Sequence, residues 1–270
     1  MDRYRLKNII IILILVLVNL FLLGSLGQRR IAEHRSYKTS VEQLTTLLAA
    51  DGVSLDPDLI PSQSLPPIQS FSRCPDTDRK AASFLLGDTP GYAEQGGGIY
   101  TYSGERGAAL FRSNGSFEAA GTLSSQDGEE FCRKFSRQFG YDEPVFQLDG
   151  EGTGIALSTR RWSRLPVFNC TITFTLAKNT VVAVSGTLLP DISTEFTPEV
   201  PPLSALAALN IFQQFRQGTG AVVTAIIGIE PCYELQSTTA APLSLFPAWC
   251  IITDTASYYV NAVTGTIRPY

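Results

Sequence analysis

The stretch Phe168-Asn-Cys170-Thr-Ile172-Thr-Phe174-Thr-Leu176 decides the fold, because apolar side chains occupy every second position along it. Threonine fills the alternate positions from Thr171 to Thr175. A period of two is typical of a β-strand that buries one face and exposes the other. The turn at 177–180 and the apolar run 181–188 then predict an antiparallel hairpin.

The same pattern returns 80 residues further along the chain. Cys170-Thr-Ile-Thr-Phe-Thr175 recurs as Cys250-Ile-Ile-Thr-Asp-Thr255, and, after a one-residue shortening, 181–188 recurs as 260–267. A helical pattern upstream aligns as well, with Phe131, Cys132, Phe135 and Gly140 matching Ile211, Phe212, Phe215 and Gly220. We therefore expect an α+β fold of tandem subdomains, each a helix packed on an antiparallel sheet, with Cys170 and Cys250 in equivalent core positions.

Other elements are predicted from apolar spacing and end signals. Helices are expected over 39–50, 76–86 and 126–139, the last ended by Gly140, and a fourth opens at Pro201-Pro202 and ends at Gly218 or Gly220. The predicted caps are Thr39 or Ser40 (with Glu42 or Gln43 completing a capping box), Asp76 or Thr77, and Ser124 or Ser125. A proline-rich linker covers 57–67, and 99–122 indicates a β-meander.

An apolar segment near the amino terminus predicts a membrane anchor. Between Lys7 and Arg29 lie 21 uncharged residues, 8–28, which as a helix would reach about 31 Å, close to the hydrocarbon thickness of a bilayer. A cleaved signal peptide is the competing interpretation, because Ser25-Leu26-Gly27 offers small residues at a cleavage position. The long apolar run and the basic pair that follows it favour an uncleaved helix.

Flanking charge bears on the orientation of this anchor. Three basic residues precede the span and four follow it closely, so the positive-inside rule gives nearly a tie. A short basic tail before a large polar body favours a single-pass protein of the cell membrane, with a cytoplasmic N-terminus and an extracytoplasmic main domain. Asn19 lies within the span, where it is either a hydrogen-bonding contact for another membrane helix or a tolerated polar residue.

These features divide the chain into four regions. Residues 1–28 form the tail and transmembrane helix, and 29–98 form a juxtamembrane helical and linker region. Residues 99–190 form the first α+β subdomain, and 191–270 form the second, which repeats about 126–190.

The composition argues against catalysis and metal binding. His34 is the only histidine and lies just beyond the predicted span, so the main body can assemble no Ser/His/Asp or Cys/His set. The five cysteines lack the CxxC spacing of a zinc or dithiol site, and Cys232 and Cys250 either form a disulfide or stay free and buried. We expect no catalytic residues, no cofactor and no metal. The excess of acidic residues beyond residue 38 argues against a nucleic-acid partner.

One basic cluster stands out in this acidic body, Arg160-Arg161-Trp162-Ser163-Arg164. Arg160, Arg161, Trp162 and Arg164 are candidates for a partner contact, with the tryptophan as an anchor. The alternative is a solvated loop or edge strand whose charges discourage aggregation.

Motifs at both ends resemble the YycI family, regulators of the YycFG (WalKR) two-component system of Gram-positive bacteria. Met1-Asp-Arg-Tyr-Arg-Leu-Lys7 leading into Val18-Asn19-Leu20-Phe21-Leu22 looks like the start of a YycI protein. Pro231-Cys-Tyr-Glu-Leu235, Pro247-Ala-Trp249 and Tyr258-Tyr-Val-Asn-Ala-Val-Thr-Gly265 resemble the closing strands of YycI-type and PepSY-like domains. The resemblance implies a non-enzymatic, membrane-anchored extracytoplasmic protein whose partners are a sensor histidine kinase and a YycH-like companion regulator.

Two functional hypotheses follow. In the first, the chain modulates a sensor histidine kinase through protein contacts and transmembrane-helix contacts. In the second, it is an anchored binding module of the cell envelope for wall polymer or peptide, and the membrane helix is only a tether.

Overall fold

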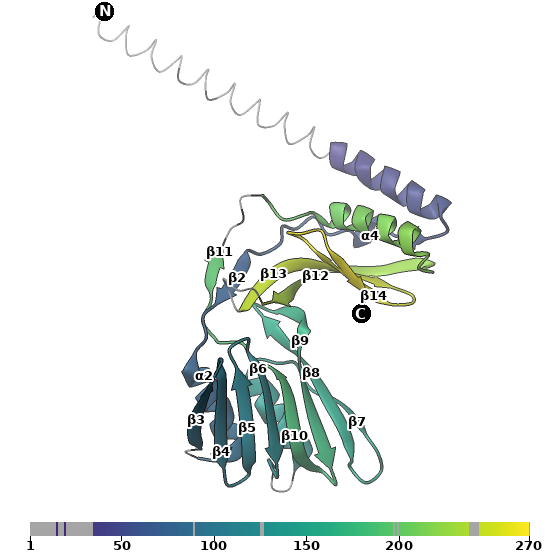
Figure 1. Ribbon diagram of the computed structural model, residues 1–270. Coiled ribbons are helices and arrows are strands. Elements are labelled where there is room, and N and C mark those ends of the chain that lie inside the picture. Colours follow the sequence, from purple (N-terminus) through teal and green to yellow (C-terminus); the bar gives the residue numbers. More distant parts are fainter. Residues whose placement is uncertain are drawn as a thin grey trace, which may run out of the picture.

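The computed structural model describes residues 35–88, 90–124, 127–196, 198, 200–237 and 243–269, together with Leu15 and Asn19. The fold is mixed α+β, with a large, mainly antiparallel sheet in two halves and a pair of helices on each half (Figure 1). Within this described part, no helix is both long and apolar enough to cross a bilayer. The predicted span 8–28 lies outside the described residues, apart from Leu15 and Asn19.

Sheet 1 is the half that carries the predicted meander. Its strands are β3 (Gly91–Gly96), β4 (Ile99–Gly104), β5 (Gly107–Arg112), β6 (Ser116–Gly121), β7 (Val145–Leu148), β8 (Gly154–Trp162), β9 (Leu165–Ala177) and β10 (Thr180–Thr187). They pair antiparallel in the order β7-β8-β9-β10-β6-β5-β4-β3. The meander over 99–122 and the strand centred on Ile172 are therefore confirmed.

Two helices pack against one face of sheet 1, α2 (Pro75–Leu86) and α3 (Gly128–Gln138). The even-numbered residues of β9 from Ile172 to Leu176 face them, and they share a core with Cys132 and Phe135 of α3. The alternation in β9 is thus the reason the sheet has a helix-covered face, because only that face offers a continuous apolar surface.

Sheet 2 is the half that carries the helix at 35–50. It contains β1 (Ser54–Leu55), β2 (Ile68–Phe71), β11 (Thr194–Phe196), β12 (Ala225–Gln236), β13 (Leu243–Thr253), β14 (Ser257–Asn261) and β15 (Ile267–Pro269). The short 3-10 helix η1 (Pro57–Leu59) lies between β1 and β2 in the chain. The helix at 35–50 and α4 (Ala205–Thr219) lie on its outer face (Figure 1). Leu48, Phe212, Trp249 and Ile251 are fully buried in the core beneath them.

The long strand β9 joins the two halves. Beyond its pairing with β10 it runs alongside β12, with Val167 opposite Tyr233 in parallel register. The Asn169 side chain continues this contact, because its amide donates to the Leu235 carbonyl and its oxygen accepts from the Leu235 N–H, both at 2.7 Å. A side chain here replaces a missing pair of backbone hydrogen bonds.

The predicted repeat holds for element order and fails for strand register. Helix, hairpin and following strand recur as α4, β12–β13 and β14. However, odd-numbered Trp249 and Ile251 face the helix in the second copy, and Cys250 packs on the opposite face with Cys232 and Phe168. Because the offset of 80 is even, a true repeat would turn even-numbered residues toward the helices in both copies. The predicted equivalence of Cys170 and Cys250 is therefore wrong.

The predicted structural equivalence of 181–188 and 260–267 is wrong as well. Gly186 lies inside β10, whereas its sequence counterpart Gly265 has a φ of 71° in the turn between β14 and β15. The same residue types therefore form one continuous strand, β10, in the first copy and parts of two short strands, β14 and β15, in the second.

The predicted helix ends need correction. The amino-terminal helix already includes residue 35, so Thr39 and Ser40 lie inside it and their hydroxyls donate to the carbonyls of Arg35 and Ser36. Asp127 caps α3 by accepting from the Glu130 N–H, and Ser204 caps α4 by accepting from the Ala207 N–H. The α2 helix begins at Pro75, after Cys74, so Asp76 and Thr77 lie in its first turn. Gly220 ends α4, as predicted.

The region 29–98 contributes to both halves. The strand β2 pairs with β13 and β11 in sheet 2, while α2 and β3 belong to the layers of sheet 1. The chain thus crosses from one half to the other well before residue 99.

Candidate functional site

The amino-terminal helix is fixed to sheet 2 and is the element closest to the predicted anchor. Val41, Leu44 and Leu48 are buried along one face, at the spacing of an amphipathic helix. They share a core with Ala208 and Phe212 of α4. Residue 35, where the described helix starts, is only seven positions after the end of the predicted span.

A polar cluster locks the end of this helix to α4. The Asp51 carboxylate accepts hydrogen bonds from Gln213, from Arg216 at 2.9 Å and from Gln217 at 2.8 Å. The Arg216 side chain is mostly buried, and its Nε donates to the Gln213 side-chain oxygen at 3.1 Å. Because a charge-assisted hydrogen bond is about twice as strong as a neutral one, we regard this Asp51 cluster as the clamp between helix and subdomain.

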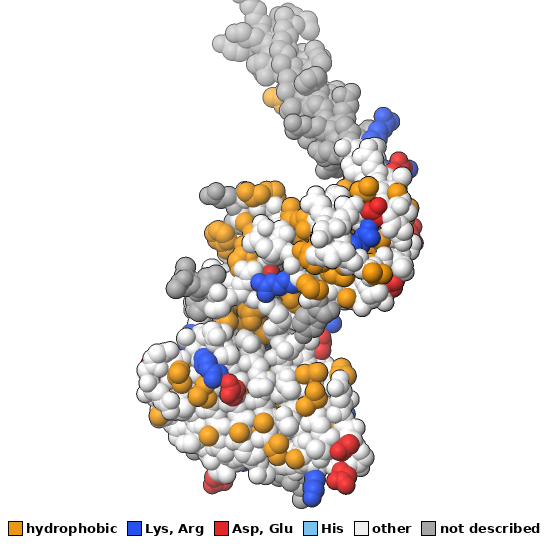
Figure 2. All heavy atoms as spheres, turned by 45° about the vertical axis from the view of Figure 1, so that its right-hand side comes forward, with side chains coloured by type: hydrophobic (Ala, Val, Ile, Leu, Met, Phe, Trp, Pro, Cys, Tyr) orange, Lys and Arg blue, Asp and Glu red, His pale blue; other side chains and the backbone are white. Residues whose placement is uncertain are grey.

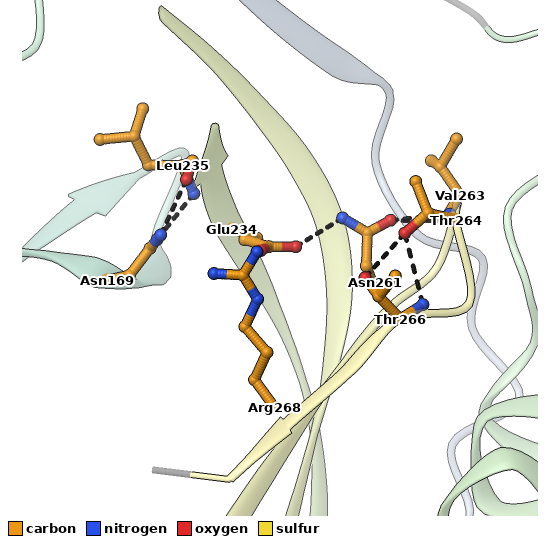
Figure 3. Close-up of polar contacts among 8 residues, drawn as sticks. All are labelled: Asn169, Glu234, Leu235, Asn261, Val263, Thr264, Thr266 and Arg268. Carbon is orange, nitrogen blue, oxygen red and sulfur yellow. Dashed lines mark hydrogen bonds and ion pairs between the residues drawn. The ribbon is translucent and has the colours of Figure 1, made fainter. Parts of the chain in front are cut away.

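A second polar cluster lies on the opposite face of sheet 2 (Figure 3). Glu234 is only 2% exposed, and one carboxylate oxygen accepts from the Asn261 amide at 2.6 Å. The other oxygen lies 3.3 Å from the guanidinium of Arg268, an exposed side chain on β15. The oxygen of Asn261 accepts in turn from the N–H groups of Val263 and Thr264, so the buried carboxylate positions the turn before β15.

Within the described residues, no group of three or more His, Cys, Asp or Glu side chains could hold a metal ion. His34, the only histidine, lies outside the described residues. Figure 2 shows charged side chains scattered over one face of the molecule in ones and twos, with apolar side chains gathered around sheet 2.

The predicted partner contact at 160–164 occupies the junction of the two halves. Arg160 is 5% exposed and donates to the Phe139 carbonyl, and its guanidinium lies 5.8 Å and 5.9 Å from the rings of Tyr141 and Trp162. Trp162 contacts Phe71 edge-to-face at 4.8 Å. Arg160 is thus a buried structural residue, and Gly140 is required beside it because a Cβ there would lie 1.5 Å from the guanidinium.

The rest of this cluster forms the hairpin between β8 and β9. Arg161 pairs with Asp142 and donates to the Arg164 carbonyl at 2.7 Å. Ser163 and Arg164 adopt the positive φ of a tight turn, 48° and 73°. Arg161 and Arg164 therefore stay candidates for a partner contact, whereas Arg160 does not. The signal for burial was present in the sequence, because Arg160 continues the alternation of Ala156 and Ser158.

The membrane-contact candidate Asn19 is helical and exposed in the structure. Its side-chain amide donates to the Leu15 carbonyl, four positions earlier in the sequence, at 2.8 Å.

All five cysteines are free, which makes the suggested Cys232–Cys250 disulfide wrong. The two residues are diagonal neighbours on β12 and β13, since Cys232 lies opposite Ala248 and Cys250 lies opposite Glu230. Diagonal pairs are about 7–8 Å apart at Cα, beyond the usual reach of a disulfide. Burial raises the pKa of Cys132 and Cys170 to about 12, and it also raises the pKa of Cys232 well above the ordinary thiol value.

Cys74 is different, because it is partly exposed at the start of α2 and a hydrogen bond with the Thr77 side chain lowers its thiol pKa. Since the thiolate is the reactive form, we expect a maleimide to modify one thiol per folded chain. The modification rate should rise with pH, with a midpoint below the ordinary pKa of a cysteine thiol. Mass spectrometry of the full chain in detergent checks this. Cys74→Ser should leave the folded chain unmodified, and more than one adduct on the folded wild type would contradict the burial of the other four.

Comparison with known proteins leaves the family open. No family model matches the chain, and no curated protein matches it. An uncharacterized protein from Eubacterium rectale resembles it with 11% identity and a TM-score of 0.45, over 77% of this chain and 81% of that one. The Bacillus megaterium YpeB C-terminal domain resembles it with 12% identity and a TM-score of 0.34, over 73% of this chain and 98% of that domain. Both scores lie below 0.5, so membership of the YycI family stays a prediction.

Proposed function

We propose that this chain is a membrane-anchored regulator whose extracytoplasmic body acts by binding and modulates a sensor histidine kinase. The apolar segment 8–28 would hold it in the membrane and contact the transmembrane helices of the kinase. A YycH-like companion would complete the assembly, as the motif resemblance implies. No catalysis is assigned to the body.

The observation that carries the proposal is the docking of helix 35–50 on α4. A flexible tether would need neither the buried leucines nor the three hydrogen-bond donors that hold Asp51. Fixed in this way, the helix makes sheet 2 follow any shift of the segment that precedes it. Such rigidity is what a regulator needs to pass a binding event to the membrane, and a tether does not need it.

Regulation also requires an energetic difference between kinase states. Coupling between two sites is typically worth about 1–3 kcal/mol, a factor of about 5 to 150 in an equilibrium. The anchor helix would supply that difference by packing better against one arrangement of the kinase helices than against the other.

Replacing residues 1–28 with an unrelated single-pass helix tests this role of the anchor. We expect the exchanged protein to reach the membrane with an unchanged thermal unfolding transition of the body. We also expect it to lose its effect on kinase autophosphorylation, measured in membrane vesicles that contain the kinase.

The control is the unmodified chain at equal abundance in the same vesicles. Unchanged kinase output after the exchange would contradict lateral contact and would favour the anchored envelope-binding module, because a tether is replaceable. A chain found only in the soluble fraction would contradict both hypotheses.

A further inference from the structure

Among the described residues, no helix or strand covers one face of sheet 1. The helices α2 and α3 pack on the other face (Figure 1), and the odd-numbered residues of β9 from Thr171 to Thr175 point away from them. Two rows of side chains, one through Thr173 and one through Thr175, cross all eight strands on this open face. Because a sheet face in water normally carries polar and charged side chains, the composition of these rows indicates what the open face meets.

The open face is nearly free of charge. Glu118 is the only charged residue in the two rows, and Arg112 in the next row pairs with it at 2.9 Å. The two rows contain no aromatic side chain on which a sugar ring could stack, and no basic side chain for an anionic polymer or lipid headgroup. The charges that usually protect an exposed sheet from association are therefore missing here.

The middle of the open face is hollow because its side chains are small. Ala108, Ala120 and Ala183 are neighbours on β5, β6 and β10, and they line a depression of about 610 Å³. Larger aliphatic side chains, Ile155 and Leu157, lie to one side on β8. The face is thus uneven from one edge of the sheet to the other.

This unevenness makes the open face complementary to itself under a two-fold rotation. With the axis parallel to the strands and midway between β6 and β10, β8 of each copy lies over β4 of the other. Ile155 and Leu157 then lie opposite the shorter side chains of Ser103 and Thr101 of the partner subunit, in the same rows. Large side chains meet small ones on both sides of the axis, which allows two sheets to pack closely.

The centre of the face fits the same arrangement. The strand β9 lies over β5, so Thr175 enters the depression at Ala108 of the partner subunit. The strand β10 lies over β6, which brings the Ser185 hydroxyl, a hydrogen-bond donor, to the carboxylate of Glu118 of the partner subunit.

The open face is also large enough for a stable pair. Eight strands spaced about 4.8 Å apart span about 38 Å, and three rows of residues extend about 20 Å along the strands. The face therefore measures about 750 Å², or about 1,500 Å² for two copies, which is the size of a standard stable interface.

We propose that two copies of this chain pair through the open face of sheet 1, about a two-fold axis parallel to its strands. Helix 35–50 lies on sheet 2, at one end of these strands (Figure 1), so the axis places both amino-terminal helices at the same end of the pair. Two anchors can then enter one membrane, as the proposed function requires. The pairing itself depends on neither the anchor nor the kinase.

Sedimentation equilibrium of the full chain in a density-matched detergent tests the pairing. We expect a monomer–dimer equilibrium whose dissociation constant is at least about tenfold higher for Ala120→Arg, because the pair would bury an uncompensated charge. Residue 120 is exposed in the single chain, so the thermal unfolding transition should stay unchanged. The control is Ala49→Arg, at an exposed alanine of helix 35–50, and it should stay within about twofold of wild type.

Engineered cysteines in the Cys74→Ser chain test the orientation of the two copies. When Leu157→Cys chains and Thr101→Cys chains are mixed, a bismaleimide with a two-carbon spacer should join them, because packed sheets lie about 10 Å apart. Neither chain should cross-link to itself, since two copies of either position lie about 24 Å apart across the axis. A chain that stays monomeric, an unchanged dissociation constant in Ala120→Arg, or absence of the mixed cross-link would each overturn the proposal.

Discussion

Replacing Phe135 with alanine should lower the free energy of unfolding by about 3–5 kcal/mol, the largest single effect that we expect in sheet 1. The side chain is fully buried where α3 meets the sheet. Its ring lies 4.4 Å from Phe139, 5.4 Å from Phe84 and 5.7 Å from Phe174, so its removal leaves a cavity that rigid aromatic neighbours cannot fill. Urea denaturation followed by circular dichroism measures the loss.

Phe131→Ala is the matched control for this change. Phe131 lies one turn earlier on α3 and is only partly buried against the same core. Its loss should cost less than half as much, because less apolar surface leaves the core. Equal costs for the two variants would mean that α3 is rotated relative to its position in the structure.

Replacing Leu48 with alanine should cost about 3–5 kcal/mol and release the amino-terminal helix from α4. Leu48 is fully buried between this helix and the core of sheet 2, and it supplies apolar contact that the hydrogen bonds of neighbouring Asp51 do not replace. Without the leucine, the helix should detach before the rest unfolds, because a short isolated helix is marginal in water. Hydrogen exchange should then lose protection over 35–50 while sheet 1 stays protected.

The adjacent Leu47 provides the control. It is 48% exposed on the same helix, so Leu47→Ala should change stability by less than about 0.5 kcal/mol. Strong protection of 35–50 in Leu48→Ala would show that the helix is not held by this core, and the proposed transmission through it would fail.

Local sequence patterns predict which segments form the layers of this fold, but they do not predict which strand residues face the helices. The alternation from Phe168 to Leu176 and the meander over 99–122 each describe a surface with one buried face, which a strand expresses directly. The repeated motif at Cys250 was misleading because matching residue types do not reveal which face of a strand the odd-numbered residues occupy. In sheet 2 the odd-numbered residues face α4. The choice of face depends on the packing of the whole layer, which a similarity of six residues does not determine.

Helix ends and polar clusters were less predictable for a related reason. Thr39 and Ser40 have the chemistry of caps, yet the helix extends past them and their hydroxyls bond backward to its own carbonyls. The Asp51 clamp joins residues more than 160 positions apart, so no local pattern announces it. The pairing of Tyr92 with Tyr102 is similar, since only the β3–β4 register brings these two residues together.

The most direct test of the central claim, that an anchor holds this body outside the cytoplasm, is the labelling of Cys74 in intact cells with a membrane-impermeant maleimide. Cys74 is suited to it because the other four thiols are buried. The account predicts labelling of the membrane-associated wild-type chain before permeabilisation and none of Cys74→Ser. Labelling of the wild type only after permeabilisation would place the body on the cytoplasmic side and contradict the account.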